Sequence, residues 1–348
     1  MTLFHMQEFA NALTNFNIEP KLVVDSDVYD GFPSTNIVSW FQSRLKFNKL
    51  VCEFRPDAIL VDRQRHFCLA AAQTKLPSFM LLRGDFWKEA EAAKEKYKSL
   101  PAHIAISRWQ KIAEQCFSQT NVILPVCKYL ENIVKARYPD KPTPVLYTGI
   151  NPSRWYAAEP MNLKHPCVGL LQTAVIWDKT KEMLTLTKAL ESMPEVMFYW
   201  AGDGYFRHRV LEVLGKYDNF KWLGMLQYPD KVREYLSTID VYALASGLDM
   251  SPLSLQQAQL MERPVVATNV GGIPELMVNE KTGLLVEKGD YKGWIEKLSL
   301  LINDEKKGKQ MGAAAREFVK YNFSWDRIAK RFVEILGTYL GKSERNRT

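Results

Sequence analysis

The amino-acid sequence predicts an α/β protein of two domains, each built on a parallel sheet. Short apolar runs rich in β-branched residues alternate with longer segments of helical periodicity along nearly the whole chain, a pattern typical of βα units. The 348 residues also exceed the usual size of a single hydrophobic core. We therefore expect two sheets of ordinary size rather than one large one.

The first half contains four runs that predict strands and two segments that predict helices. Helical periodicity covers residues 5–13 and the long stretch 87–118. A segment with several prolines and a Gly-Ile-Asn turn, residues 143–166, predicts the crossing to the second domain. We place the N-terminal domain at residues 1–150, and its expected strands are 21–25, 58–62, 78–82 and 122–126.

A second α/β series fills residues 151–322. The C-terminal tail of the chain, residues 323–348, carries Ile328, Phe332 and Ile335 at helical spacing. This spacing predicts an apolar helix face that must be buried. We expect this helix to pack back on the N-terminal domain. The expected strands of the second domain are 167–171, 196–202, 220–224, 241–245, 264–268 and 283–287.

Composition excludes several classes of protein. Hydrophobic residues make up 47% of the chain and charged residues 24%, a mixture typical of a globular protein. The net charge of +7 lies mainly in the N-terminal half. The basic residues form no block of like charge, so the sequence does not indicate nucleic-acid binding. Five cysteines without C-x-x-C spacing indicate neither a disulfide framework nor a zinc site, so we expect a cytoplasmic location. No apolar run approaches the length of a membrane span.

Three strand ends of the second half carry turns suited to a phosphate. These are residues 201–204, 246–249 and 269–272, the last leading to Glu275. Each glycine turn alone indicates no more than a tight bend. Their order, across residues 196–210, 220–246, 249–276 and 282–290, resembles the retaining glycosyltransferases of the GT-B fold, family four. The resemblance implies two Rossmann-like domains that face each other across a cleft, with the donor on the second and the acceptor on the first.

The donor motif of that family is a pair of glutamates separated by seven residues, matched here by Asp249 and Gln257. The resemblance implies that Asp249 faces the transferred sugar and that Gln257 binds the ribose. Aspartate has a shorter reach than glutamate, and glutamine lacks its charge, so its bonds to hydroxyls are weaker. The loop amides expected to meet the sugar and the diphosphate are those of Met250, Ser251, Pro252, Leu253, Ser254 and Leu255. The resemblance also assigns Gly202, Gly204, Met225, Leu226 and Glu275 to the donor site.

The family places an arginine and a lysine against the diphosphate, where positive charge stabilises the leaving group. The arginine position is Leu170 here. The lysine pattern, Lys followed by Leu, Ala and Leu, begins at Lys181, and Lys179 is a nearby alternative. For either lysine, a solvated helix start is the competing interpretation.

The N-terminal half matches the family less closely. Arg83, in an Arg-Gly-Asp turn after a predicted strand, stands where the family has a histidine near the reacting carbon. It is expected to meet the donor phosphate or an anionic acceptor, or else to form a surface ion pair with Asp85. His66 is a possible acceptor-site residue. The chain begins at the helix of His5, so the family's first strand and glycine loop are either truncated or replaced by another segment.

The resemblance implies transfer of a sugar from a nucleoside-diphosphate sugar to a sugar, glycan or lipid-linked acceptor, with retention at the anomeric carbon. We expect no metal and no cofactor, because no cluster of Asp, His or Glu is typical of a metal site. Catalysis would then rest on positioning and electrostatics. The alternatives are a catalytically silent nucleotide-sugar-binding protein and a GT-B epimerase.

Residues 86–115 mix basic side chains with Phe86, Trp87, Tyr97 and Trp109. This mixture is compatible with peripheral contact with the anionic inner face of a membrane, where a lipid-linked acceptor would lie. A solvated helix flank is the alternative interpretation.

Overall fold

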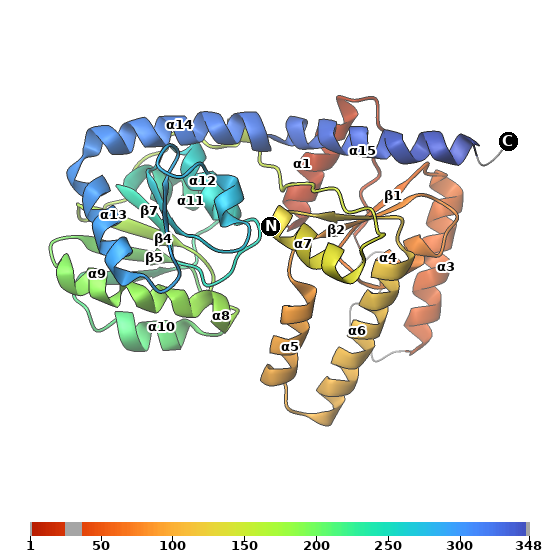
Figure 1. Ribbon diagram of the computed structural model, residues 1–348, viewed down its shortest axis with the longest axis horizontal. Coiled ribbons are helices and arrows are strands. Elements are labelled where there is room, and N and C mark those ends of the chain that lie inside the picture. The colour runs from red at the N-terminus through yellow and green to blue at the C-terminus, as the bar shows by residue number, and fades with distance from the viewer. Residues whose placement is uncertain (1, 25–36, 346–348) are drawn as a thin grey trace. The chain divides into compact units, whose positions relative to one another are not determined.

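The computed structural model describes the backbone of residues 2–24 and 37–345. The chain divides into two compact units. Unit 1 combines Met1–Gly149 with Trp325–Thr348, and unit 2 is Ile150–Ser324. Both are α/β units (Figure 1). The chain therefore leaves unit 1 once and returns to it with its last helix.

The sheet of unit 1 has three parallel strands in the order β1-β2-β3. They are β1 (Ile59–Asp62), β2 (Ser78–Leu82) and β3 (Val122–Pro125), and every residue of β2 and β3 is buried. The strands expected at 58–62, 78–82 and 122–126 are confirmed. The strand expected at 21–25 is wrong where the structure describes it, because residues 21–24 have no regular structure; Asp25 lies outside the described residues.

The helical stretch expected at residues 87–118 is two helices instead of one. Its first helix ends at Lys96, and the second begins at Leu100 with Pro101 in its first turn, where proline loses no hydrogen bond. The two helices run side by side away from the sheet (Figure 1). The helices of unit 1 are α1 (Thr2–Thr14), α3 (Ile37–Phe54), α4 (His66–Ala72), α5 (Phe86–Lys96), α6 (Leu100–Gln119), α7 (Lys128–Arg137) and α15 (Trp325–Arg345).

Helix α15 is held in unit 1 by aromatic packing. The Phe332 ring lies 5.7 Å from that of Phe9 on α1 and 5.6 Å from that of Phe79 on β2, both edge to face. At the start of α15, the Trp325 indole donates to Glu8 at 3.1 Å. The apolar face predicted from the spacing of Ile328, Phe332 and Ile335 is buried, as the hydrophobic effect requires.

The sheet of unit 2 has six parallel strands in the order β6-β5-β4-β7-β8-β9. All six strands expected in the second half are confirmed, with ends shifted by at most a residue. They are β4 (Cys167–Leu171), β5 (Met197–Ala201), β6 (Phe220–Gly224), β7 (Val241–Leu244), β8 (Val265–Thr268) and β9 (Leu284–Val286). The strand order reverses direction between β4 and β7, which places the topological switch point there.

Side chains alternate across this sheet, and both faces of its strands β4, β5, β7 and β8 are buried. Val168 and Leu170 of β4 join a core with Phe198 and Trp294, whereas Gly169 faces the other way, toward Tyr235 of α11. The remaining elements of unit 2 are η1 (Pro152–Arg154), α8 (Trp177–Thr180), η2 (Lys181–Leu186), α9 (Thr187–Ser192), α10 (Arg207–Leu214), α11 (Asp230–Thr238), α12 (Leu253–Leu260), η3 (Ile273–Leu276), α13 (Tyr291–Asn303) and α14 (Glu305–Phe323). The predicted α/β class with parallel sheets is confirmed.

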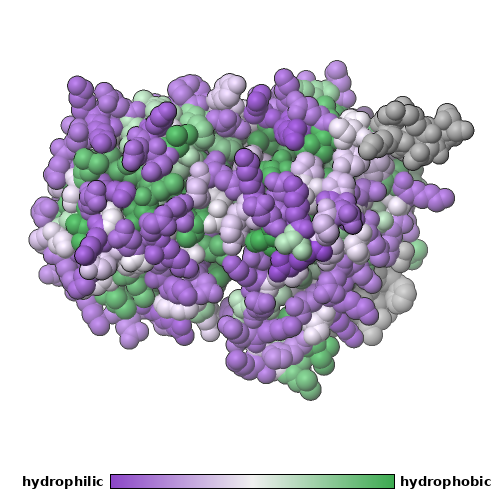
Figure 2. All heavy atoms as spheres, viewed as in Figure 1, coloured by the Kyte–Doolittle hydropathy of each residue, from purple (hydrophilic) through white to green (hydrophobic). Residues whose placement is uncertain are grey.

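On the face seen in Figure 2 the surface is mixed, and polar side chains cover most of it. Among the described residues, no helix combines the length and the apolar character needed to cross a bilayer. The five cysteines are all free thiols.

Two glycines of α14 provide a test of how closely this helix packs. A Cβ on Gly312 would lie 2.0 Å from the backbone oxygen of Glu262, whereas a Cβ on Gly308 would meet Pro264 at an ordinary 3.4 Å. We expect Gly312→Ala to destabilise unit 2 by about 1–3 kcal/mol through overpacking. Gly308→Ala, one turn away, should stabilise it by about 0.5–1 kcal/mol, because alanine favours helix over glycine. Calorimetric unfolding of both variants measures the difference; equal effects would show that α14 can move away from Glu262 without cost.

Candidate functional site

The candidate site lies at the carboxyl ends of the strands of unit 2, on either side of the switch point. Gln172 follows β4, and its Nε2 donates to the carbonyl oxygen of Ala245 after β7 at 2.9 Å. This bond joins the two loops that flank the switch point. Open parallel sheets bind their ligands at such a place, because the loops there diverge to opposite faces of the sheet.

The loop after β7 carries an ion pair at its centre. The amine of Lys179, from α8, contacts the carboxylate of Asp249, and the two side chains are 23% and 11% exposed. Main-chain bonds fix the same contact, since the Gly247 amide donates to the Lys179 carbonyl at 2.9 Å. A second amine, that of Lys288, donates to the Gly247 carbonyl at 3.1 Å. Two cations thus converge on one short loop.

Glycines allow the neighbouring loops to approach this centre. Gly271, after β8, has φ +58°, and a Cβ there would lie 2.2 Å from the Asp249 carbonyl oxygen. The next amide, Gly272, donates to that oxygen at 2.8 Å. Gly202, after β5, has φ +154°, and its Cβ would lie 2.0 Å from the Gln172 carbonyl oxygen. Only glycine combines these backbone conformations with such contacts.

Helix α12 starts directly after the Asp249 loop. The Met250 amide donates to Asp249 Oδ1 at 2.9 Å, and the buried hydroxyl of Tyr242 donates to Ser254 at 2.8 Å. Burial raises the pKa of Tyr242, so its hydroxyl keeps its proton at neutral pH and remains a donor. These bonds fix the first turn of α12 against β7. The other loop residues expected at the donor site, Ser251, Pro252, Leu253 and Leu255, lie in the same turn or immediately before it.

Gln257 lies in the second turn of α12 and is only 3% exposed. Its neighbour Gln259 is also buried and donates to the Leu276 carbonyl at 3.1 Å, which ties α12 to η3. Glu275 lies in η3, after the β8 loop. Helix α12 carries Gln257, and the β7 loop directly before it carries Asp249. The structure thus connects both residues of the expected donor motif with η3, which carries Glu275.

Three other expected donor-site residues also lie at carboxyl ends of strands. Gly204 follows β5, and Met225 and Leu226 follow β6 at the edge of the sheet. Met225 is 63% exposed. Strand β6 contacts the loop after β5 through the Trp222 indole, which donates to the Gly202 carbonyl at 2.7 Å.

The structure does not bring Lys181 to Asp249. The Lys181 amine lies 2.6 Å from the carboxylate of Asp178 in an exposed pair, which is the solvated helix start given as the competing interpretation. Lys179, the nearby alternative, occupies the position at Asp249. Leu170, where the family has an arginine, is fully buried in the core.

In unit 1, Arg83 is paired with a different carboxylate from the one expected. Its Nε donates to Asp62 Oδ1 at 2.6 Å, and Nη2 contacts Met6 Sδ at 3.1 Å. The suggested surface pair with Asp85 is wrong, because Asp85 is buried and accepts from the Lys88 amide as the N-cap of α5. Arg83 therefore joins the carboxyl ends of β1 and β2.

His66 opens α4 as its first residue. Burial lowers the pKa of the His66 imidazole, which keeps the ring neutral at pH 7. A neutral imidazole can accept as well as donate a hydrogen bond, as an acceptor-site residue requires.

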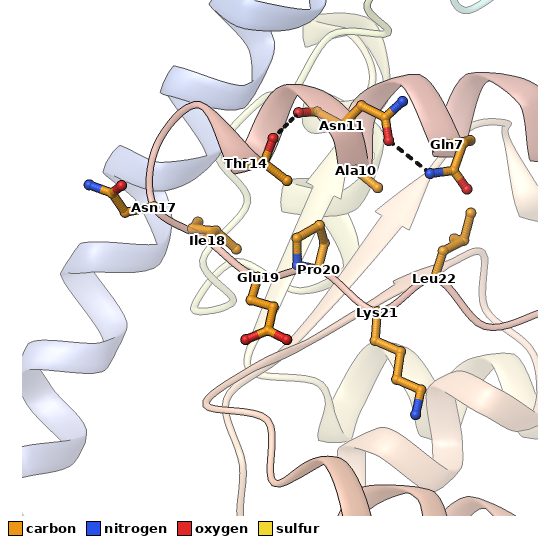
Figure 3. A pocket seen from close by; sticks show the side chains of 10 residues that line it. All are labelled: Gln7, Ala10, Asn11, Thr14, Asn17, Ile18, Glu19, Pro20, Lys21 and Leu22. Atoms are coloured by element: carbon orange, nitrogen blue, oxygen red, sulfur yellow. Dashed lines mark hydrogen bonds between the residues drawn. The ribbon is translucent and has the colours of Figure 1, made fainter.

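A hollow of about 740 Å³ lies elsewhere in unit 1, between α1 and the extended segment that follows it (Figure 3). Its wall is mostly polar, and Gln7 donates to Asn11 at 2.9 Å along one side. The chain continues from the far wall at Leu22 toward residues 25–36, which the structure does not describe. None of the expected site residues lines this hollow, so we do not regard it as the functional site. Its lining residues are Gln7, Ala10, Asn11, Thr14, Asn17, Ile18, Glu19, Pro20, Lys21 and Leu22.

Two residues of the site have no counterpart in the sequence-based prediction. Gln172 and Lys288 belong to it only because β4, β7 and β9 are near one another in the sheet. Each follows a predicted strand closely, so a search for polar residues at strand ends would have found both. The structure also brings His165, Cys167 and Asp240 together, a cluster that has no counterpart among the predicted sites.

Comparisons with known proteins agree with this geometry. Residues 168–304 match the model of the family described as glycosyl transferases group 1. The capsular polysaccharide biosynthesis glycosyltransferase CapM of Staphylococcus aureus is 41% identical over 88 residues, which are 25% of this chain and 23% of CapM. The GDP-mannose-dependent monoacylated alpha-(1-6)-phosphatidylinositol monomannoside mannosyltransferase of Corynebacterium glutamicum is 30% identical over 159 residues, 43% of this chain and 41% of that protein. The matches thus cover less than half of either relative.

The fold is similar to that of HepE from Anabaena, solved in complex with UDP, with a TM-score of 0.66 and 17% identity over 86% of this chain and 84% of HepE. The predicted GT-B type of fold is confirmed by such neighbours and by the two parallel sheets. The matched segment contains nearly all of β4 and the whole of the other five strands of unit 2. It also contains the loops of the candidate site, with Lys179, Asp249 and Gln257. The match to the glycosyl transferases group 1 model thus spans the part of unit 2 that contains the candidate site.

Proposed function

We propose that this chain is a glycosyltransferase that binds a nucleoside-diphosphate sugar at the carboxyl ends of β4, β7 and β8. The observation that carries the proposal is the Lys179–Asp249 ion pair at the switch point of a sheet whose sequence matches the model of a glycosyltransferase family. The reaction transfers the sugar to an acceptor with retention of the anomeric configuration. Retention rests on the family resemblance, and analysis of the product anomer by NMR tests it.

Each part of the site has a role in this reaction. Lys179 stabilises the negative charge that develops on the departing diphosphate, and Lys288 adds a second positive charge from the β9 side. Asp249 orients the Lys179 amine and accepts from a hydroxyl of the transferred sugar. The first turn of α12 offers backbone amides to the diphosphate. With two lysines in these positions, the leaving group needs no divalent cation.

Gln257 has the role of the ribose contact. Its burial fits a neutral amide in place of the family's glutamate, because an unpaired buried carboxylate would cost more than an amide. Its amide can donate and accept hydrogen bonds. The contact with the ribose is therefore weaker than one made by the family's glutamate. A larger share of the donor affinity then comes from the lysines at the diphosphate.

The names of the relatives suggest two classes of acceptor, an intermediate of polysaccharide biosynthesis and a phosphatidylinositol mannoside. The second class lies in a membrane, and the α5–α6 hairpin offers a surface for one. At its base, Phe86 is buried against Trp109 at 4.8 Å, and Trp87 stacks on Phe117 at 4.9 Å. These aromatic rings therefore stabilise the hairpin and are not free for a bilayer.

The tip of the hairpin differs from its base. Tyr97, Leu100 and Ile104 are 50%, 75% and 50% exposed, and apolar spheres mark the free end of the hairpin in Figure 2. The neighbouring Lys94, Lys96 and Lys98 are exposed as well. Residues 94–104 carry three lysines and one glutamate, and apolar side chains beside a net positive charge fit the interface of an anionic bilayer. The proposal is that this tip rests on the membrane that holds the acceptor.

A pair of lysine variants tests the donor site. Lys179→Ala should weaken the binding of nucleoside diphosphates by about 1.5–3 kcal/mol, or about 10- to 100-fold, the contribution of a hydrogen bond to a charged group. Lys181→Ala, two residues away, should leave the affinity within about twofold, because that amine is paired on the surface. Calorimetric titration with UDP, GDP and ADP measures both. The reverse order of effects would restore Lys181 as the diphosphate residue.

Turnover and donor binding of the wild type and of Asp249→Asn together distinguish an enzyme from a silent binding protein. The change keeps the shape of the side chain but removes its charge, so we expect kcat to fall at least about tenfold while donor affinity changes little. Transfer and hydrolysis of UDP-, GDP- and ADP-sugars are followed in the wild type and the variant. Tight donor binding without turnover in the wild type would support the silent alternative, and conversion of the sugar without an acceptor would support the epimerase.

The hairpin tip is tested by flotation with vesicles. The double variant Leu100→Ser, Ile104→Ser should lower the partition coefficient onto vesicles rich in phosphatidylglycerol about tenfold or more, since each buried aliphatic side chain contributes roughly 1.5–3 kcal/mol. The matched control is Leu45→Ser, which removes a 67% exposed leucine from α3. The membrane proposal is contradicted if the double variant and the control bind the vesicles equally well. It is also contradicted if binding of the wild type to the vesicles does not weaken with added salt.

A further inference from the structure

Three potential metal ligands meet at the amino ends of β4 and β7, at the edge of the sheet opposite the donor site. His165 and Cys167 lie at the start of β4, and Asp240 directly precedes β7. One ligand atom from each lies within 4.8 Å of the other two. The residues come together because β4 and β7 are neighbours in the sheet, although they are more than seventy positions apart in sequence.

We infer that His165, Cys167 and Asp240 form a site for a zinc ion. The three groups are an imidazole, a thiol and a carboxylate, the side chains that bind Zn²⁺ in proteins, with a solvent molecule as the fourth ligand. When the thiol and carboxylate are ionised, their two negative charges balance those of the ion. Hard cations such as Mg²⁺ or Ca²⁺ prefer all-oxygen sites, so the sulfur selects against them.

Two of the three separations between ligand atoms lie within about 0.6 Å of those around a tetrahedral ion, and the third, between Cys167 Sγ and the Asp240 carboxylate, is at most 4.8 Å. Bond lengths of about 2.3 Å to sulfur and about 2.0–2.1 Å to nitrogen place the two ligand atoms about 3.6 Å apart. Cys167 Sγ and His165 Nδ1 are 3.7 Å apart. His165 Nδ1 and Asp240 Oδ2 are hydrogen-bonded at 2.8 Å and must open by about 0.6 Å to share a metal. Both side chains are nearly half exposed, which leaves room for that movement.

The surroundings hold the site in place and allow access to it. Cys167 is fully buried, while His165 and Asp240 are 46% and 40% exposed, so an ion reaches the sulfur only when these two side chains move apart. The Cys167 amide donates to Asp240 Oδ2 at 2.7 Å, which fixes the carboxylate. The partly buried guanidinium of Arg263 interacts electrostatically with both Cys167 and Asp240, and its positive charge partly opposes the binding of a cation. Because a zinc-bound thiol is deprotonated, binding releases a proton and weakens at low pH.

The experiment uses the full chain without an affinity tag, titrated with Co²⁺ as a spectroscopic substitute for Zn²⁺. One equivalent should produce a thiolate-to-cobalt charge-transfer band in the near ultraviolet, and Zn²⁺ should abolish it. His165→Ala and Cys167→Ser should remove the band and weaken Zn²⁺ binding at least about tenfold, the lower end of the loss caused even by outer-shell changes. The matched control, Cys52→Ser, removes the exposed cysteine and should leave the band intact.

Other results overturn the inference. These are no band in the wild type at excess Co²⁺, a band that persists in His165→Ala, or a band lost in Cys52→Ser. Since Cys167 is buried, Cys167→Ser is first checked by circular dichroism. If it does not fold, His165→Ala decides the question alone, because His165 lies at the surface. Addition of Zn²⁺ should also raise the melting temperature of the wild type and not that of His165→Ala.

Discussion

The reversal of strand order between β4 and β7 is the constraint on which the rest of unit 2 depends. At that point the loops after two neighbouring strands turn to opposite faces of the sheet, and a ligand can enter between them. The Gln172 amide bridges the gap to Ala245, and the glycines at 202 and 271 let the flanking loops approach to backbone contact. A side chain at either glycine would push a loop away and displace the residues that it carries.

The electrostatics of the site follow from the same arrangement. A parallel sheet collects its strand ends along one edge, so lysines far apart in sequence can meet at one loop. Lys179 and Lys288 both contact the stretch from Gly247 to Asp249, while Leu170 is enclosed in the core. Positive charge is thus available at the switch point without an arginine on β4. Asp249 compensates part of it, which limits the repulsion between the amines.

The opposite edge of the sheet shows the same principle at work on other residues. The starts of β4 and β7 bring His165, Cys167 and Asp240 within reach of one another, as their ends bring Gln172 and Asp249 to the other edge. The hairpin of α5 and α6 is a separate case in unit 1. Its base is stabilised by packed aromatic rings, whereas the apolar side chains at its tip are at least half exposed.

The sequence by itself determined the elements and most of the motif. Strands with continuous apolar runs were predicted correctly because burial on both faces leaves a local signature, and the positions of Asp249 and Gln257 follow from spacing along one loop and helix. The exceptions have physical reasons. Residues 21–24 are apolar enough for a strand but gain no partner in the described sheet. The segment 87–118 breaks at residues 97–99 because Pro101, in the first turn of the second helix, cannot continue a helix from the preceding turn.

Only the tertiary structure decided which side chains meet. Lys179 and Lys181 are equivalent in composition and nearly so in position, but the helical turn directs one amine to Asp249 and the other to solvent. Arg83 pairs with Asp62 because β1 and β2 end side by side, not with Asp85, whose carboxylate is occupied as a helix cap. Contacts between strand ends depend on the order of strands in the sheet, and that order is fixed by packing among residues distant in sequence, which no local pattern contains.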